Sequence, residues 1–254
     1  MPERKFRIWR GDSGGGKFVD YSVETDHGMV VLDAVHRVQT LHANDLAVRW
    51  NCKAGKCGSC SCEINGSPRL SCMTRLGDYP ENETITIQPI KTFPIIRDLV
   101  TDVSWNYEQN KKIPPFEPGE PDEDGQSGDV GRAGDYRMLQ QDVDRIQEFR
   151  KCTECFLCQD VCHVLRDHDR KDSFVGPRFM IRAASLDMHP LDTLDRIPAI
   201  REEYGSGFCN ITRCCTEVCP EHINITDNGI IPLKERVVDR YYDPLVWLKR
   251  KVFG

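Results

Sequence analysis

Hydrophobic and charged residues alternate twice near the start of the chain. Phe6 and Ile8 have charged neighbours, and the same period of two returns over residues 19–23. Such alternation is typical of strands with one buried face. We therefore expect two strands, with the glycine run at residues 14–16 as the loop between them.

The hydrophobic period then changes. Residues 31–38 place hydrophobic side chains at helical spacing, whereas Ile85 and Ile87, flanked by threonines, indicate a later strand. Pro94 suits the first turn of a helix. We expect the helix that it begins to bury one face, made of Ile96, Leu99, Val100, Val103 and Tyr107.

From residue 114 to residue 135 the periodic pattern disappears. This stretch has four prolines, five glycines and seven acidic residues against one basic residue. Such a composition cannot bury enough surface to offset the entropy lost on ordering, so we interpret it as a linker or a mobile excursion.

Helical periods return beyond this stretch, first at residues 139–149. Pro177 and Pro232 each suit the start of a helix, and Gly205 suits the end of one. Because this half has no strand pattern, the sequence predicts an α+β protein in which a mixed first domain precedes a helical one. The expected parts are residues 1–112, the acidic linker at 113–135 and the helical domain at 136–254.

Composition and charge narrow the function classes. The chain has 254 residues, 39% of them hydrophobic, and a net charge of -6 without a basic cluster interleaved with aromatic residues, so we do not expect nucleic-acid binding. No window approaches the roughly 18 consecutive hydrophobic residues of a spanning helix, and the N-terminus lacks a hydrophobic signal core. We expect a chain that is soluble by itself and intracellular.

Thirteen cysteines stand out in a chain with no sign of export. In a reducing compartment, thiols at short fixed spacings are more often metal ligands than disulfide partners. Cys52, Cys57, Cys60 and Cys72 have the spacing of plant-type 2Fe-2S ligands. Structural zinc is the alternative, but zinc sites usually combine two CxxC pairs and this set has one. Glycines in this loop let backbone N–H groups approach the sulfurs.

Two further cysteine runs have the spacing of bacterial ferredoxins. In such domains the fourth cysteine of each run ligates the cluster of the other run. The second run has Thr212 in place of its second cysteine, and a hydroxyl is a poorer ligand for iron than a thiolate. Crossed ligation then predicts a 4Fe-4S site of Cys152, Cys155, Cys158 and Cys219, and a 3Fe-4S site of Cys162, Cys209 and Cys215.

These sets use eleven of the thirteen cysteines and leave Cys62 and Cys214. Cys214 precedes Cys215 directly, so it is an alternative fourth ligand for the last site. Adjacent residues rarely aim both side chains at one cluster, and we favour a plain buried thiol for both leftover cysteines.

Three one-electron centres in one chain form a conduit, which needs an electron donor and an electron acceptor. The chain has no G-x-G-x-x-G motif, no phosphate-binding loop and no nucleophile motif. We therefore expect no catalysis at carbon by this chain, and no catalytic residue in it. A partner must supply that chemistry.

The cysteine pattern resembles the iron-sulfur subunit of succinate dehydrogenase and fumarate reductase. The segments at residues 49–60 and 68–72 match the 2Fe-2S loop, and the two later runs match the second domain. The resemblance implies a plant-type ferredoxin (β-grasp) domain followed by an all-α bacterial-ferredoxin-like domain. It also implies a flavoprotein partner with FAD, membrane-anchor subunits, quinone as acceptor, and a peripheral position on the cytoplasmic face of the inner membrane. Succinate oxidation in the tricarboxylic acid cycle and respiratory chain is the expected activity, with fumarate reduction as its reverse.

The sequence departs from familiar members beside the last cluster. After Cys162 it has His163, and after Cys209 it has Asn210. We name His163, Asn210 and Lys234 as candidates for the quinone vicinity, with a solvated or buried role without chemistry as the alternative for His163. The hydrophobic and basic segment at 243–253 suits an interface with the anchor or packing on its own domain.

Two other functions compete. A subunit of another flavin oxidoreductase would normally carry two complete four-cysteine runs, which Thr212 contradicts. A zinc-stabilised interaction protein would be colourless, whereas an iron-sulfur protein is brown.

Overall fold

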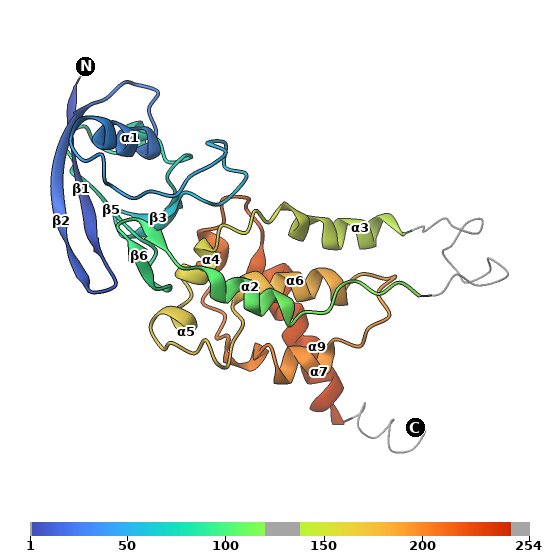
Figure 1. The fold of residues 1–254 in the computed structure, drawn as a ribbon. Helices are drawn as coiled ribbons and strands as arrows, with labels where there is room; N and C mark the ends of the chain where they lie inside the picture. Colours follow the sequence, from blue (N-terminus) through green and yellow to red (C-terminus); the bar gives the residue numbers. More distant parts are fainter. Residues whose placement is uncertain (1, 120–137, 245–254) are drawn as a thin grey trace.

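The computed structural model of the chain describes residues 2–119 and 138–244. A lobe built on a β-sheet lies at one end of the molecule and a helical lobe lies at the other, so the protein is α+β (Figure 1). Most of the predicted acidic linker and of the segment at 243–253 lies outside the described residues. Among those residues, no helix combines the length and the hydrophobicity needed to cross a membrane.

The first two strands form a hairpin, as the alternation predicts. Strand β1 (Glu3–Asp12) pairs antiparallel with β2 (Gly15–Glu24), with Phe6 opposite Tyr21. Phe6 and Ile8 are fully buried beneath helix α1 (Val31–Leu41), whose Val31, Val35 and Val38 face the same core. The predicted helix at 31–38 is therefore confirmed.

The rest of the sheet extends from both sides of β1. The strand order is β4-β3-β5-β1-β6-β7, with β2 pairing β1. Strand β5 lies parallel to β1 and confirms the strand predicted at Ile85 and Ile87. The remaining strands are β3 (Ser61–Ile64), β4 (Ser67–Leu70), β5 (Ile85–Gln88), β6 (Ile95–Arg97) and β7 (Val100–Thr101).

The helix predicted from Pro94 is wrong. Its first half is the β6–β7 hairpin, and a helix, α2 (Ser104–Lys111), begins only ten residues after Pro94. Asp98 explains the difference, because its backbone is left-handed (φ 49°) and its carboxylate accepts N–H groups of Gly11 and Ala47. A left-handed residue with such tertiary partners interrupts a helix whatever the hydrophobic spacing around it.

The hairpin of β3 and β4 was not predicted, although it has a sequence signal. Asn65 and Gly66 join the two strands, both with positive φ (49° and 78°). Asn-Gly between short strands is the strongest local indication of a two-residue hairpin turn. The hairpin carries the chain from Cys60 to Cys72, so it determines where the fourth thiol of the first set lies.

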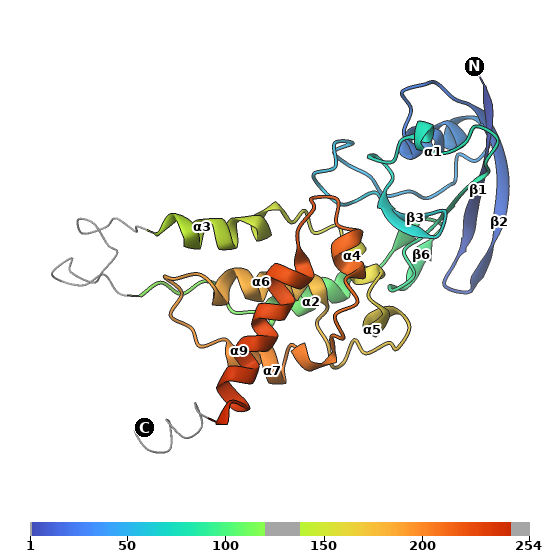
Figure 2. The ribbon, with the colours of Figure 1, turned by 180° about the vertical axis from the view of Figure 1, so that it is seen from behind.

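Helices α3 to α9 form the second lobe, and α2 packs against it (Figure 2). Helices at 139–149, after Pro177 and after Pro232 are confirmed, and Gly205 (φ 66°) follows the end of α7. Within the described residues this lobe has no strand. The helices are α3 (Gln140–Gln147), α4 (Leu157–Asp160), α5 (His163–Arg166), α6 (Pro177–Asp187), α7 (Ile197–Glu202), α8 (Cys214–Glu217) and α9 (Ile231–Tyr241).

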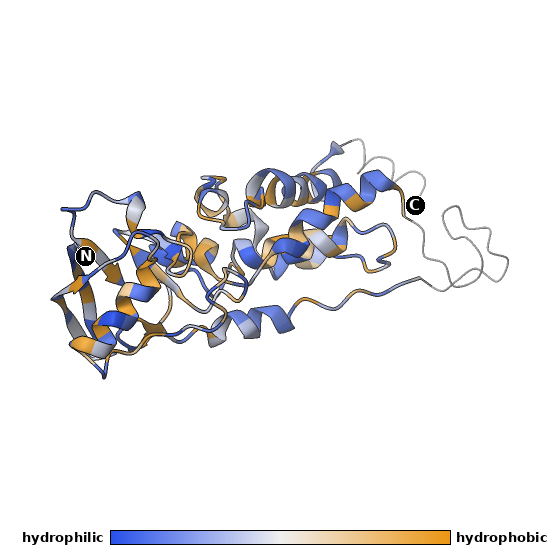
Figure 3. Cartoon of the chain, turned by 90° about the horizontal axis from the view of Figure 1, so that it is seen from above, coloured by the Kyte–Doolittle hydropathy of each residue, from blue (hydrophilic) through white to orange (hydrophobic). Residues whose placement is uncertain are grey.

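Each lobe has its own hydrophobic core. Figure 3 shows hydrophobic residues in both lobes, with hydrophilic residues sharing the same helices and strands. A third, smaller cluster joins them, in which Leu157 of α4 packs with Cys60 and Cys72 of the sheet lobe. The two lobes therefore meet where two of the cysteine sets lie.

A buried polar network also joins the lobes. The Glu63 side chain is completely buried. One of its carboxylate oxygens lies 2.8 Å from a guanidinium nitrogen of Arg166, and the other lies 3.2 Å from Lys91 Nζ. Asp160 of α4 accepts the backbone N–H groups of Lys91 and Thr92, and burial raises its pKa to about 6. Because buried polar groups are costly without partners, these pairs fix how the lobes meet.

Candidate metal centres

The first cysteine set lies on a loop and on the adjoining hairpin of the sheet lobe. Lys53, Gly55 and Gly58 all have positive φ, which curls the loop between the thiols. The backbone N–H groups of Ala54 and Lys56 lie 3.4 and 3.3 Å from Cys52 Sγ. The loop thus presents N–H donors to sulfur, an arrangement that stabilises a more negative, reduced cluster.

The four thiols of this set interact with one another. Burial opposes ionisation of Cys57, but hydrogen bonds from the backbone N–H groups of Cys52 and Ser59 lower its pKa to about 6. Burial raises the pKa of Cys72 to about 12, and the neighbouring thiols of Cys60 and Cys52 add to this. Cys52 is exposed while Cys60 and Cys72 are buried, so the set spans the loop from its surface to its base.

The two ferredoxin-type cysteine runs adopt the same backbone conformation. Glu154 and Phe156 have φ of 55° and 62°, and the equivalent Ile211 and Arg213 have φ of 60° and 64°. A one-turn helix follows at the equivalent position in each run, α4 and α8. Thr212 therefore occupies the place that Cys155 has in the first run.

Each of two cavities in the helical lobe is lined by cysteines from both runs. One brings three cysteines of the first run together with one of the second: Cys152, Cys155, Cys158 and Cys219. The other brings one of the first run together with two of the second: Cys162, Cys209 and Cys215. These groupings are those that crossed ligation requires.

The donor chemistry of both cavities suits iron-sulfur clusters. Burial raises the pKa of Cys155 to about 12 and that of Cys158 far above its usual value, so these thiols ionise only with a bound cation to stabilise them. In the part of the chain that the structure describes, no three His, Cys, Asp or Glu side chains converge on a single ion. Each cavity instead gathers thiols of both runs, which are the ligand type of iron-sulfur clusters.

The leftover cysteines differ from each other. Cys62 is a buried thiol of the sheet-lobe core, as expected. The same interpretation of Cys214 is wrong, because this residue is only partly buried, lines the second cavity and lies with its Sγ 3.2 Å from Thr212 Oγ1. It sits at the start of α8, whose first turn faces the cavity.

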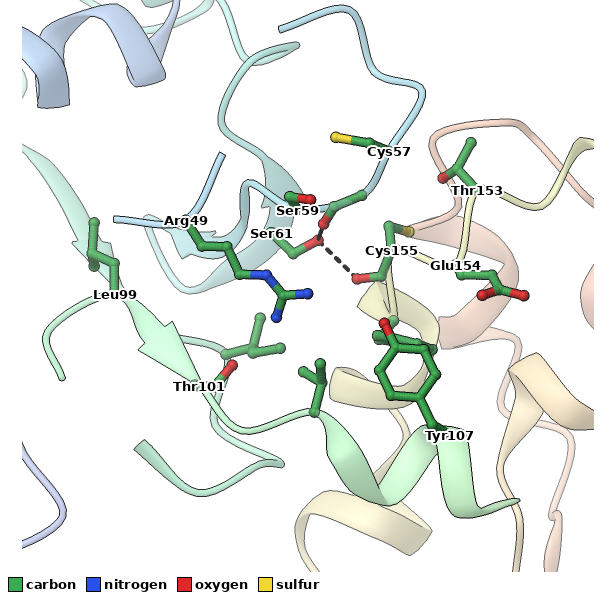
Figure 4. A pocket seen from close by; sticks show the side chains of 14 residues that line it. Arg49, Cys57, Ser59, Ser61, Leu99, Thr101, Tyr107, Thr153, Glu154 and Cys155 are labelled. Atoms are coloured by element: carbon green, nitrogen blue, oxygen red, sulfur yellow. Dashed lines mark hydrogen bonds between the residues drawn. The ribbon is translucent and has the colours of Figure 1, made fainter. Parts of the chain in front are cut away.

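The loop of the first set touches the first ferredoxin-type run directly. A Cβ on Gly58 would lie 2.5 Å from Cys155 Cα, and Ser61 Oγ donates a hydrogen bond of 2.8 Å to the Cys155 carbonyl. Figure 4 shows this junction, with Arg49 pointing into the pocket beside it. The two sites are therefore held together by backbone packing.

The three candidates for the quinone vicinity do not share one place. His163 and Asn210 both line the cavity of Cys162, Cys209 and Cys215. Lys234 is not among the lining residues, and its Nζ donates to the carbonyls of Ser206 and Cys209 at 3.0 and 2.7 Å. Lys234 thus holds the loop that carries Cys209.

The fold and these thiol sets define the class of the protein: an electron-transfer protein with several iron-sulfur clusters. Family models agree, since a "2Fe-2S iron-sulfur cluster binding domain" matches residues 5–108 and a "4Fe-4S dicluster domain" matches residues 148–223.

Comparison with individual proteins narrows the class to a family. A chain of the solved "Mycobacterium smegmatis Sdh1 complex in the apo form" is 60% identical, with a TM-score of 0.90 over 97% of this chain and 100% of that one. The succinate dehydrogenase iron-sulfur subunit of Bacillus subtilis is 33% identical over 70% of this chain and 68% of its own. The fumarate reductase iron-sulfur subunit of Mycobacterium tuberculosis is 29% identical over 82% and 81%. The chain belongs to the family of iron-sulfur subunits of succinate dehydrogenase and fumarate reductase, and its function is electron transfer within that oxidoreductase.

Proposed function

We propose that the chain conducts electrons from the FAD of a succinate-oxidising flavoprotein to membrane quinone, as part of the tricarboxylic acid cycle and the respiratory chain. The observation that carries this proposal is the pair of cavities lined by cysteines of both runs, one of which adjoins the loop of the first cysteine set at Cys155. Bound clusters supply one-electron redox chemistry at these places. The polypeptide holds them in a fixed order.

The proposed ligands follow from which thiols share a site. Cys52, Cys57, Cys60 and Cys72 hold a 2Fe-2S cluster, and Cys152, Cys155, Cys158 and Cys219 hold a 4Fe-4S cluster. The third site has Cys162, Cys209 and Cys215, and it holds a 3Fe-4S cluster because Thr212 stands where a fourth thiolate is needed. Electrons run through the three sites in this order, since the first set touches the first ferredoxin-type run at Cys155.

We assign the two lobes to the ferredoxin types that these ligand sets accompany. Residues 1–112 form a plant-type ferredoxin (β-grasp) domain and residues 136–254 form a bacterial-ferredoxin-like domain, with the acidic linker at 113–135 between them. The flavoprotein docks on the sheet lobe, and membrane-anchor subunits hold the helical lobe at the cytoplasmic face of the membrane. Relatives named for both directions support the oxidoreductase and leave fumarate reduction as the alternative.

The direction of the reaction, succinate oxidation or fumarate reduction, is tested on the purified complex once its quinone has been identified. We expect succinate oxidation coupled to quinone reduction to be faster than fumarate reduction by the reduced quinone. A complex that reduces fumarate faster would favour the alternative.

Thr212→Cys is expected to admit a fourth iron at the third site. The backbone around residue 212 already matches that around Cys155, so the new thiol would take the position of a fourth ligand. Low-temperature EPR of the oxidised complex should lose its 3Fe-4S signal, whereas Thr212→Ser, which keeps a hydroxyl, should retain it. An undiminished 3Fe-4S signal in Thr212→Cys would show that another feature of the site excludes the fourth iron.

His163→Ala and Asn210→Ala are expected to weaken quinone binding. Both residues line the cavity of the third cluster, where a polar donor can reach a quinone oxygen. Loss of one such hydrogen bond costs about 1 to 2 kcal/mol, so the apparent KM for quinone should rise about tenfold. Succinate oxidation by an artificial acceptor is the control and should not change. Unchanged quinone kinetics in both variants would place the quinone site elsewhere.

A further inference from the structure

One cationic side chain lies in the wall of the cavity formed by Cys152, Cys155, Cys158 and Cys219. Arg178, the second residue of α6, lines that cavity and is 6% exposed. Among the described residues that line the same cavity, Arg178 is the only one with a positive charge. A buried charge is expensive unless its surroundings compensate it, so its presence at this position needs an explanation.

The hydrogen bonds of Arg178 use only part of the donor capacity of its guanidinium group. Its Nη2 donates a hydrogen bond of 2.5 Å to Glu154 Oε1, on the loop between Cys152 and Cys155. Glu154 is 46% exposed at its side chain, so solvent screens that carboxylate. The Nε of Arg178 is buried and has no hydrogen-bond partner among the described residues.

A cluster bound in this cavity would offer sulfur acceptors to an unpartnered N–H group of a residue in its wall. Cluster sulfurs and cysteine sulfurs accept N–H hydrogen bonds, and such bonds raise the reduction potential by stabilising the extra electron. A guanidinium remains charged at any physiological pH, so its effect on the cluster is constant.

We propose that Arg178 is a positioning residue that sets the potential of the 4Fe-4S cluster, with its Nε–H donating to a cluster or cysteine sulfur and its charge opposing the negative charge of the reduced cluster. This inference rests on the proposed ligand set of Cys152, Cys155, Cys158 and Cys219. Reduction adds one electron to the cluster and moves no proton to Arg178. The residue therefore favours the reduced form without taking part in the transfer itself.

The test is a redox titration of the complex isolated with its partner subunits, followed by low-temperature EPR. Arg178→Met keeps a long side chain but removes both the charge and the donor. At a fixed potential near the midpoint, the ratio of reduced to oxidised 4Fe-4S cluster should fall about tenfold, which is about 59 mV for one electron. Arg178→Lys keeps the charge and should recover part of the shift, while the potentials of the other two clusters should not move.

Arg182 provides a matched control. It lies one turn farther along α6, and its Nε is also buried without a hydrogen-bond partner in the described part of the chain, but it is not among the residues that line the cavity. Arg182→Met should leave the 4Fe-4S potential unchanged. An unshifted potential in Arg178→Met, or an equal shift in Arg182→Met, would overturn the proposal.

A second variant covers the case in which Arg178→Met assembles no 4Fe-4S cluster. Glu154→Gln removes the anionic partner of Arg178 and leaves the guanidinium uncompensated. We then expect the reduction potential of the 4Fe-4S cluster to rise. An unchanged or lowered potential would contradict the role proposed for Arg178. Absence of a 4Fe-4S signal in the wild-type complex would instead refute the ligand set. A normal signal without these shifts refutes only the role of Arg178.

Discussion

Gly58→Ala is expected to separate the first cysteine loop from the first ferredoxin-type run. The added Cβ would lie 2.5 Å from Cys155 Cα and 2.8 Å from its backbone nitrogen, and residue 58 has φ +66°. Left-handed strain costs about 1 to 2 kcal/mol, and overpacking against backbone adds about 1 to 3 kcal/mol. A total of about 2 to 5 kcal/mol is a large part of the stability of an ordinary domain. Succinate-to-quinone turnover and the thermal midpoint of the complex should both fall.

Gly66→Ala is the control that distinguishes backbone strain from the steric clash with Cys155. Gly66 also has positive φ (78°), in the turn between β3 and β4, but a Cβ there would meet nothing within 4 Å. It should cost only about 1 kcal/mol in unfolding free energy and leave electron transfer intact. Equal effects of Gly58→Ala and Gly66→Ala in thermal denaturation and turnover would show that contact between the two loops is not needed.

Replacing the fourth cysteine of either run by alanine should damage the cluster of the other run. Cys162→Ala, in the first run, is expected to abolish the 3Fe-4S signal and spare the 4Fe-4S signal. Cys219→Ala, in the second run, is expected to do the opposite, because each thiol lines the cavity of the other set. Loss of a thiolate ligand removes one of the metal bonds that hold the cluster.

EPR spectra of each variant, recorded in the oxidised and in the reduced state, show which cluster is lost. Cys62→Ala is the matched control, since Cys62 is buried in the sheet-lobe core and lines neither cavity. It should leave all three signals unchanged. If Cys162→Ala damages the 4Fe-4S cluster and Cys219→Ala the 3Fe-4S cluster, ligation is not crossed.

The fold could be predicted wherever local pattern and tertiary contacts agree. Phe6 and Ile8 alternate with charged residues, and they are buried in a strand. The prediction of a helix after Pro94 was wrong because the Asp98 carboxylate accepts hydrogen bonds from the backbone N–H groups of Gly11 and Ala47. These residues are distant in sequence, so the local hydrophobic period does not reveal the contact. The β3–β4 hairpin could have been found from Asn65 and Gly66.

The candidate sites were predictable from spacing, since cysteine positions in sequence limit which thiols can meet. Spacing does not say what lines the rest of a cavity. Arg178 carries no signal in the sequence beyond following Pro177. Lys234 stays a prediction for the quinone vicinity, and the sequence did not reveal that it binds the carbonyl groups of the loop that carries Cys209. Such contacts join residues that lie far apart in sequence.

The most direct test of a three-cluster relay is low-temperature EPR of the isolated complex before and after succinate is added. We expect a 3Fe-4S signal in the oxidised sample, which disappears with succinate while a reduced 2Fe-2S signal appears. An oxidised sample without a 3Fe-4S signal, or one whose signal succinate leaves unchanged, would contradict it.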